Sequence, residues 1–270
     1  MKIGIVGYGT VGKHLERTFA NAGFQIYIYD KYKPEYNHPD ARKMVNKADR
    51  VFVAVPTPSG KNGCDLSAVE EVVEWLEPPI CIKSTIVPGT TNRLVTQTGK
   101  WIVFSPEYVG ETPYHPYRHG VDPDLVVVGG AREAAEQFIS LYKQALGPIP
   151  HYFITDAVTA ELAKYMENCF FATKIVFVAQ FFLLAQQFGA DFDEMREIWL
   201  ADSRVGRSHS AVIDSLGFGG RCLPKDLAAV IKAAEEHQGA PFLEGVQKFN
   251  DDLHKKDLPT QSVEVHQPVG

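Results

Sequence analysis

The sequence predicts an α/β fold, in which a Rossmann-type parallel sheet covered by helices on both faces precedes a long central helix and an all-α dimerisation domain. Short runs rich in Ile and Val alternate with amphipathic helical patterns through the first half of the chain, and this alternation is typical of a doubly wound parallel sheet. From about residue 156 to 188 the chain contains neither Gly nor Pro. That stretch predicts one helix far longer than the average of about 11–12 residues.

The chain opens with a strand, a glycine-rich turn, a helix and a second strand. The apolar run Lys2–Val6 leads into Gly-Tyr-Gly-Thr-Val-Gly, a helical pattern follows, and the strand Gln25–Tyr29 then ends at Asp30. In dinucleotide sites of this Gly-x-Gly-x-x-Gly order, the glycines permit the turn and the approach of a pyrophosphate, while the acid contacts the adenosine ribose. Because a carboxylate repels a 2′-phosphate, we expect NAD rather than NADP. The expected contacts are Gly7, Tyr8, Gly9, Thr10, Val11, Gly12 and Asp30.

The remaining pattern divides the chain into domains. Further strands are expected at 50–55, 80–83, 101–104, 125–128 and 152–154, and further helices at about 67–76, 90–96, 131–144, 193–201, 225–236 and 241–254. The NAD-binding domain is expected over 1–155, the helical domain over 156–256 and a disordered tail over 257–270. Phenylalanines occur on all sides of the long helix. Such a helix is buried either within one chain or, as we favour, in a homodimer.

The composition excludes several classes of function. The chain of 270 residues has a net charge of −6 and no dense basic cluster, so neither nucleic acid nor an anionic membrane is an expected partner. We expect no membrane-spanning segment, and no signal peptide before the strand at Lys2. The four cysteines form no Cys-x-x-Cys pair and have no metal-like spacing with histidine. A reduced, cytoplasmic protein without a metal site is therefore expected.

Polar residues follow three of the predicted strands, where ligands bind in an open parallel sheet. Hydroxyls and carboxylates occur there at 55–58, 83–91 and 105–111, although ordinary turn chemistry explains any one of these loops alone. Lys164 and Asn168 are four residues apart, which places them on one face of the long helix. Taken alone, Lys164 fits a solvated or salt-bridged lysine better than a functional one.

The segment Gly-Phe-Gly-Gly-Arg-Cys-Leu-Pro-Lys-Asp at 217–226 surrounds Cys222 with unusual neighbours. Glycines free the backbone before the cysteine, and Lys225 lies close behind it in the sequence. A thiol beside cationic groups can ionise and act as a nucleophile. The alternative is a tight turn with a buried structural cysteine, since an unbridged Cys often behaves as a small apolar residue.

Together these motifs resemble the UDP-glucose/GDP-mannose dehydrogenase family. The segments that carry the resemblance are 7–12, 55–58, 83–91, 105–107, 160–168, 202–206 and 217–226. The resemblance implies NAD-dependent oxidation of a nucleotide sugar's C6 alcohol to a carboxylate, with UDP-glucose as the favoured substrate. Members of the family typically continue with a third domain that binds the nucleotide, for which 270 residues are too few. An NAD-binding homodimer with little or no activity is therefore the alternative.

The resemblance also implies catalytic roles. Cys222 is expected to trap the aldehyde as a thiohemiacetal and then a thioester, which suits an oxidation that must not release its aldehyde. Lys164 and Asn168 are expected to stabilise the oxyanion, and Asp226 to act as an acid or base. The residues expected to hold the hydrolytic water are Thr85 and Glu107.

The resemblance implies further binding contacts as well. Those on the cofactor side are Pro56, Thr57, Ser84, Glu111 and Lys225, and those on the substrate are Gly219 and, across the homodimer, Arg204. A two-domain β-hydroxyacid dehydrogenase also joins a Rossmann domain to a helical domain and uses a lysine on the connecting helix. That third class has no use for the segment 219–226.

Overall fold

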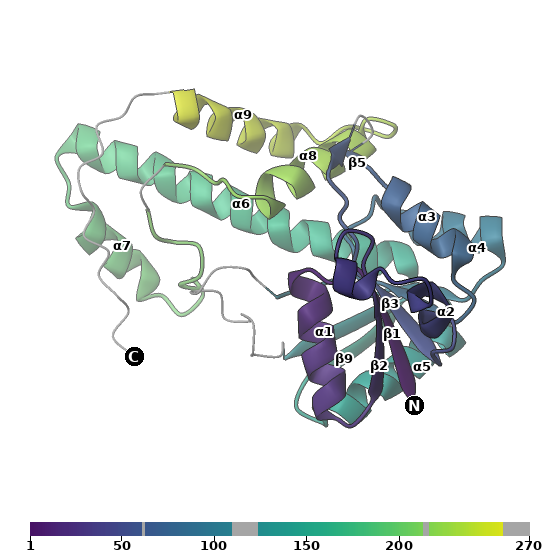
Figure 1. Cartoon of the computed structure of the whole chain (residues 1–270). Helices are drawn as coiled ribbons and strands as arrows, with labels where there is room; N and C mark the ends of the chain where they lie inside the picture. Colours follow the sequence, from purple (N-terminus) through teal and green to yellow (C-terminus); the bar gives the residue numbers. More distant parts are fainter. Residues whose placement is uncertain (61–62, 110–123, 213–215, 256–270) are drawn as a thin grey trace. The chain divides into compact units, whose positions relative to one another are not determined.

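The structure, a computed structural model, describes residues 1–60, 63–109, 124–212 and 216–255 (Figure 1). The chain divides into two compact units, Met1–Lys164 and Tyr165–Gly270. The predicted tail 257–270 and the predicted cofactor contact Glu111 lie outside the described residues.

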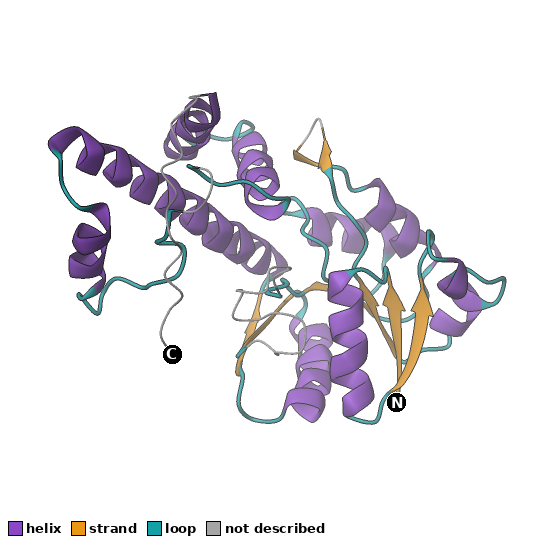
Figure 2. Ribbon diagram, turned by 60° about the vertical axis from the view of Figure 1, so that its left-hand side comes forward, coloured by secondary structure: helices purple, strands orange, loops and turns teal. Residues whose placement is uncertain are grey.

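A seven-stranded sheet in the order β2-β1-β3-β6-β7-β8-β9 forms the centre of the first unit (Figures 1 and 2). Its strands are β1 (Lys2–Val6), β2 (Gln25–Tyr29), β3 (Arg50–Val53), β6 (Ile80–Ile82), β7 (Ile102–Phe104), β8 (Leu125–Gly129) and β9 (His151–Thr155). Neighbouring strands are parallel, as predicted, except for β7 and β8, which pair antiparallel through Phe104 and Gly129. The predicted parallel sheet is confirmed, and this one junction is its exception. A short hairpin, β4 (Ser59–Gly60) with β5 (Gly63–Cys64), stands apart from the sheet.

Helices cover both faces of this sheet (Figure 2). Two of them, α1 (Thr10–Asn21) and α5 (Arg132–Leu146), bury side chains such as Phe19 and Phe138 against one face. The other face is covered by α2 (Ala41–Val45), α3 (Ser67–Trp75) and α4 (Thr90–Thr98), and Ala160 at the start of α6 packs into the same cluster. A single 3₁₀ turn, η1 (Pro34–Tyr36), follows β2. Burial of one large apolar side chain stabilises the fold by about 1.5–3 kcal/mol. Because each cluster buries many such side chains of the strands and helices, the sheet is held firmly between its two helical layers.

The predicted long helix is confirmed as α6 (Ala157–Phe188). Tyr165, Cys169, Ala172 and Val176 are buried along one side of it. Its large exposed apolar side chains form a stripe along another side: Leu162, Met166, Phe170, Phe177, Phe181 and Phe188. By length and composition α6 is also apolar enough to cross a membrane. Core helices of soluble proteins meet the same two criteria, because a helix that is apolar all round is buried in either setting.

The second unit packs three shorter helices with the later turns of α6. They are α7 (Phe192–Leu200), α8 (Cys222–Ala234) and α9 (Pro241–Lys255). An apolar cluster joins α6, α8 and α9 and includes Phe218 of the loop before α8, with Leu227, Val246 and Leu253. The shorter α7 contacts α6 through the ring pairs Phe177–Trp199 and Phe182–Phe192. The prediction that α8 begins at Lys225 is wrong, since Cys222 is already its first residue. Proline inside the first turn is compatible with this start, because the first amides of a helix have no partner within the helix.

Candidate active site and cofactor site

The glycine-rich turn after β1 has a backbone that only glycine fits at two positions. Gly7 has φ +91°, and a Cβ built there would lie 2.4 Å from the Ala54 carbonyl oxygen. A Cβ on Gly12 would lie 2.1 Å from the Gly7 carbonyl oxygen, whereas one on Gly9 would meet nothing within 4 Å. Gly7 and Gly12 therefore serve the turn and the packing of α1, and the open space at Gly9 lets a ligand approach the backbone.

Asp30 ties the end of β2 to this turn. Its carboxylate accepts hydrogen bonds from the amides of Tyr8 (2.7 Å) and Tyr32 (2.9 Å). The Tyr8 hydroxyl donates to Glu16, and burial together with that hydrogen bond raises the pKa of Tyr8 well above its usual value. These contacts hold an acid beside the N-terminus of α1, where the sequence predicted one.

The same residues fit a dinucleotide. α1 begins after Gly9 without a side-chain cap, and a helix N-terminus attracts phosphate through its amides and its dipole. The open position at Gly9 and the acid at the end of β2 complete the features that a pyrophosphate and a ribose require. Lys31, which follows the acid, is paired with Glu71 at 2.8 Å.

Two of the predicted loops at the strand ends are hydrogen-bonded to each other. The Thr57 hydroxyl donates to the Thr85 carbonyl oxygen at 2.7 Å, and the Ser84 hydroxyl donates to the Val55 carbonyl oxygen at 2.7 Å. Pro56, which precedes Thr57 in the chain, is exposed. The structure thus gathers these predicted residues at the carboxyl ends of β3 and β6.

Glu107 lies in a buried ion pair that sequence reasoning missed. The Lys83 ammonium is 3.4 Å from its carboxylate, and the two side chains are only 6% and 12% exposed. Two amides donate to Glu107 as well, from Tyr108 (2.9 Å) and Val109 (2.8 Å). Burial opposes its ionisation, but Lys83, His14 and these amides outweigh burial and lower the pKa of Glu107. Because a buried lysine needs a partner, the Lys in the strand-end segment 83–91 was a usable signal for this pair.

The surroundings of Lys83 are polar and nearly closed. Its ammonium donates to the Pro106 carbonyl oxygen (2.9 Å) and the Ser105 hydroxyl (3.3 Å). Burial disfavours its charge, but Tyr142 and Glu107 outweigh burial and raise the pKa of Lys83. A cavity of about 20 Å³ beside these groups is lined by His14 and Glu107 among others. That volume suffices for one water molecule.

The start of α6 is anchored to the N-terminus of α4. The buried Glu161 carboxylate accepts from the amides of Gly89 (2.5 Å) and Thr91 (3.0 Å), and from the Thr91 hydroxyl (2.6 Å). Burial raises the pKa of Glu161, although these donors oppose the rise. One turn further on, the Lys164 ammonium lies 5.1 Å from the ring centre of Tyr108. Lys164 is therefore a partly buried cation on an aromatic face, not a fully solvated lysine.

In the second unit the structure brings three predicted residues together. The Asn168 amide donates to Asp226 at 2.5 Å, and the Lys225 ammonium lies 2.6 Å from the other oxygen of that carboxylate. Asp226 is 1% exposed. Cys222, at the start of the same helix α8, has an exposed side chain, while the other three cysteines are buried. The alternative of a buried structural cysteine in a tight turn is therefore wrong.

Burial and the Asp226 carboxylate raise the pKa of the Cys169 thiol to about 12. Burial likewise raises the pKa of Cys81 to about 12. These buried thiols remain neutral near pH 7 and are poor nucleophiles. Cys222 is thus the cysteine whose position suits reaction with a molecule from solution.

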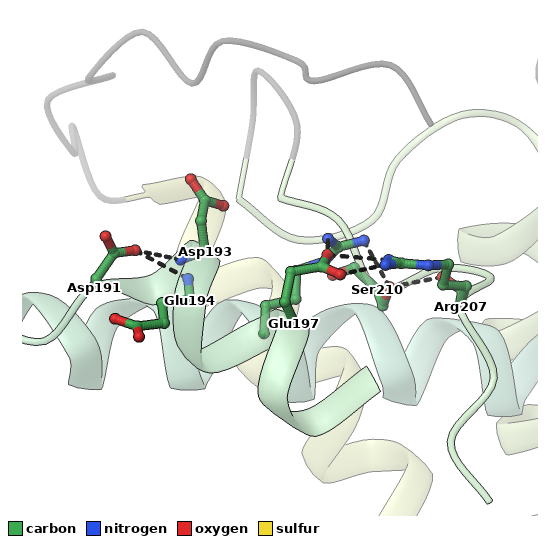
Figure 3. A network of polar contacts seen from close by, with 7 residues as sticks. Asp191, Asp193, Glu194, Glu197, Arg207 and Ser210 are labelled. Carbon is green, nitrogen blue, oxygen red and sulfur yellow. Dashed lines mark hydrogen bonds and ion pairs between the residues drawn. The ribbon is translucent and has the colours of Figure 1, made fainter. Parts of the chain in front are cut away.

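Arg204 lies on a loop that is tied to α7. Glu197 of α7 pairs with Arg207, and the Ser210 hydroxyl donates to the Arg207 carbonyl oxygen at 2.6 Å (Figure 3). Arg204 itself is 87% exposed and pairs with Asp202 at 2.5 Å. The predicted substrate contact Gly219 is also exposed, with open space around its Cα. Both residues are accessible to a ligand or to a partner chain.

Comparison with known proteins identifies the family. Residues 36–146 match the NAD-binding domain and residues 158–252 the central domain of the UDP-glucose/GDP-mannose dehydrogenase family. Residues 1–69 also match the NAD-binding domain of D-isomer-specific 2-hydroxyacid dehydrogenases. These matches, with the fitted glycine turn and acid, make NAD the cofactor of this chain.

Individual relatives of this chain agree with the family matches. UDP-glucose 6-dehydrogenase of Rickettsia prowazekii is 31% identical over 75% of this chain and 49% of its own length, and that of Pseudomonas aeruginosa is 32% identical over 70% and 45%. The chain therefore spans about half the length of these curated relatives. A solved UDP-glucose dehydrogenase of Pyrobaculum islandicum superposes with a TM-score of 0.80 and 26% identity over 93% of this chain and 68% of that one.

A 3-hydroxyisobutyrate dehydrogenase of Mycobacterium tuberculosis shares the fold, with a TM-score of 0.73 and 16% identity over 94% of each chain. At that identity the likeness concerns the fold alone, so it does not place the chain in the hydroxyacid class. The models of the family's NAD-binding and central domains together match more than half of this chain, and the relatives above are named UDP-glucose 6-dehydrogenase. This chain therefore belongs to the UDP-glucose/GDP-mannose dehydrogenase family.

Proposed function

We propose that this protein oxidises the C6 alcohol of a nucleotide sugar, UDP-glucose in the first place, to the carboxylate. The observation that carries the proposal is the exposed Cys222 at the start of α8, on the helix whose next turn holds Asp226 between Asn168 and Lys225. An alcohol dehydrogenase that stops at the aldehyde needs no thiol, whereas oxidation to the acid is helped by a covalent tether. Relatives named UDP-glucose 6-dehydrogenase support this choice of substrate.

Cys222 supplies the tether in this mechanism. NAD, when bound, accepts the hydride that leaves the sugar carbon in each of the two oxidations. The Cys222 thiolate attacks the carbon of the aldehyde to form a C–S bond, and the resulting thiohemiacetal loses a hydride and a proton to become a thioester. Water then adds to the thioester, the C–S bond breaks, and the acid and the thiol are released. The N-terminus of α8 favours negative charge on the attacking sulfur.

The other proposed catalytic residues manage charge and protons. Lys164 and Asn168 donate to the oxyanion that forms on the sugar oxygen, where fixed donors are worth more than in water. Asp226 exchanges the alcohol proton. Thr85 and Glu107 hold the water that hydrolyses the thioester. Since Glu107 is already held by Lys83 and two amides, its part is to accept a hydrogen bond from that water, not to take up its proton.

Binding follows the same reasoning. We assign the cofactor to Gly7–Gly12 and Asp30, with further contacts at Pro56, Thr57, Ser84, Glu111 and Lys225. We assign the substrate to Gly219 and, from a second copy of the chain, Arg204. A homodimer through α6 is supported by its exposed apolar stripe, in which Met166 is 79% and Phe170 60% exposed. Covering that stripe removes apolar surface from water, which favours association. We place the protein in the cytoplasm as a soluble enzyme.

The test is an assay of the 270-residue chain with UDP-glucose and NAD⁺. The proposal expects NADH and UDP-glucuronate in a ratio of about two to one, as a tethered double oxidation requires. Cys222→Ser should abolish release of the acid while leaving NAD affinity unchanged. The alternative is an NAD-binding homodimer without turnover. It would be favoured if calorimetry detected binding of NAD but not of millimolar UDP-glucose, and if the assay detected no oxidation. Full activity of Cys222→Ser would overturn the covalent mechanism.

A further inference from the structure

Asn250 on α9 is a polar side chain buried in the apolar cluster of the second unit. It is 4% exposed, and its neighbours along the same face of α9 are Val246 and Leu253. An amide buried among apolar side chains is costly unless its donor and its acceptor are both satisfied. Its partners therefore indicate why an amide stands there.

Both partners belong to one residue of the loop that leads to Cys222. The Phe218 amide donates to the Asn250 side-chain oxygen at 2.7 Å, and the Asn250 side-chain nitrogen donates to the Phe218 carbonyl oxygen at 3.1 Å. A planar amide that binds the N–H and the C=O of one residue restricts both the position and the rotation of that backbone. A single hydrogen bond would leave the rotation open.

Gly217 gives a second, independent sign that the loop and α9 are shaped for each other. Gly217 has φ +90°, and a Cβ built on it would lie 2.5 Å from the Asn250 oxygen and 3.2 Å from the His254 ring nitrogen Nε2. Any larger residue would displace the amide and strain the backbone. The contact thus requires glycine on one side and asparagine on the other.

The contact lies at the buried end of an otherwise open segment. Phe218 is 3% exposed, whereas Gly219 and Gly220 are exposed with nothing within 4 Å of a built Cβ. Glycines with open space around them have many accessible backbone conformations. The Asn250 amide therefore restrains the backbone immediately before these two glycines, four residues upstream of Cys222.

We propose that Asn250 is a positioning residue for Cys222, an inference that rests on the proposed function for its chemical meaning. By holding Phe218, it fixes the approach of the glycine segment and with it the first turn of α8. That turn presents the thiol and the helix amides that stabilise a thiolate. Asn250 is buried and acts through its contacts with Phe218.

The test measures the alkylation of Cys222 by iodoacetamide in the full chain, followed by peptide mass mapping. The variant is Asn250→Ala, and the matched control is Asp251→Ala, an exposed position next to it on α9. We expect Cys222 to react roughly two- to fivefold more slowly in Asn250→Ala. This is the range expected when a thiolate loses its stabilisation by the N-terminus of a helix. The buried Cys64, Cys81 and Cys169 are internal controls for folding and should stay unreactive in both variants.

Equal Cys222 rates in folded Asn250→Ala and in Asp251→Ala would overturn the proposal. Should Asn250→Ala fail to fold, Asn250→Asp replaces it, because a carboxylate keeps the acceptor for the Phe218 amide and loses the donor to its carbonyl. Its Cys222 rate is expected below that of the control, and a rate equal to the control contradicts the proposal. With UDP-glucose, kcat should fall while the KM for NAD is unchanged. Because alkylation needs no turnover, a chain that fails to oxidise UDP-glucose refutes the proposed function and leaves this test intact.

Discussion

Removing the buried cation Lys83 tests the electrostatic account of the first unit most directly. In Lys83→Met the apolar stem is replaced by one of similar length, so packing is largely kept. The Glu107 carboxylate then retains its two amide donors and the weaker influence of His14, and the Pro106 carbonyl oxygen loses a donor that now lies at 2.9 Å. What remains is a buried charge without its main counter-charge.

The size of the effect follows from the burial of the pair. With side chains 6% and 12% exposed, removing one partner costs about 3–5 kcal/mol of unfolding free energy. For a domain of this size that corresponds to a fall in Tm of roughly 6–20 °C. The double variant Lys83→Met/Glu107→Gln should recover part of the loss, because no buried charge is left.

The pH dependence of the unfolding free energy tests the same ion pair independently. In the native protein the pKa of Glu107 is lowered, so the ionised carboxylate stabilises the fold at any pH above the pKa of an ordinary carboxyl group. This stabilisation is lost as the pH falls through the lowered pKa. Without Lys83, burial dominates and destabilises the ionised form at neutral pH. The difference between the two proteins should therefore shrink as pH falls from 7 towards 4.

Urea unfolding followed by circular dichroism at several pH values provides the measurement. Arg132→Met is the matched control, since Arg132 forms an exposed ion pair with Glu136 on α5 and such pairs contribute little. A loss below about 1 kcal/mol for Lys83→Met, the range of surface pairs, would refute the reasoning. So would a loss that is constant between pH 7 and pH 4.

Three further predictions concern the cofactor and the partner. Gly9→Ala should leave Tm unchanged, since a Cβ there meets nothing, yet weaken NAD binding about tenfold or more because the pyrophosphate must approach that position. Gly12→Ala should lower both the Tm and the affinity for NAD. Thermal melts measure the first quantity and calorimetry the second. Glu71→Gln frees Lys31 from its ion pair, so the ammonium can attract the 2′-phosphate of NADP. The affinity for NADP should rise by roughly two- to fivefold, the range of an exposed ion pair. Equal NADP affinities of the variant and the original protein would contradict this prediction. Phe170→Glu places a charge in the exposed stripe of α6 and should shift the proposed homodimer to monomer in sedimentation velocity, whereas an unchanged sedimentation coefficient would contradict a dimer interface on α6.

Much of this arrangement could be predicted from local pattern. The glycine turn, Asp30 and the long helix α6 each have a signature within a short stretch of sequence, because backbone conformation and helical periodicity are local properties. The antiparallel pairing of β7 with β8 has no such signature, since strand direction depends on how the intervening chain returns to the sheet. The start of α8 was missed because proline is read as a helix breaker, although it is tolerated in a first turn.

The partners of buried polar groups belong entirely to the tertiary structure. The residue types at the strand ends and around Cys222 can be read directly from the sequence, and they indicate the family and the chemistry that the resemblance implies. The sequence did not determine that Lys83 pairs with Glu107, that Glu161 binds the N-terminus of α4, or that Asn250 holds Phe218. Each of these contacts joins residues far apart in the chain, and only the folded backbone brings them within hydrogen-bonding distance. Because a buried polar group must find its partner at a fixed place, the geometry of the packed helices and strands decides which one it finds.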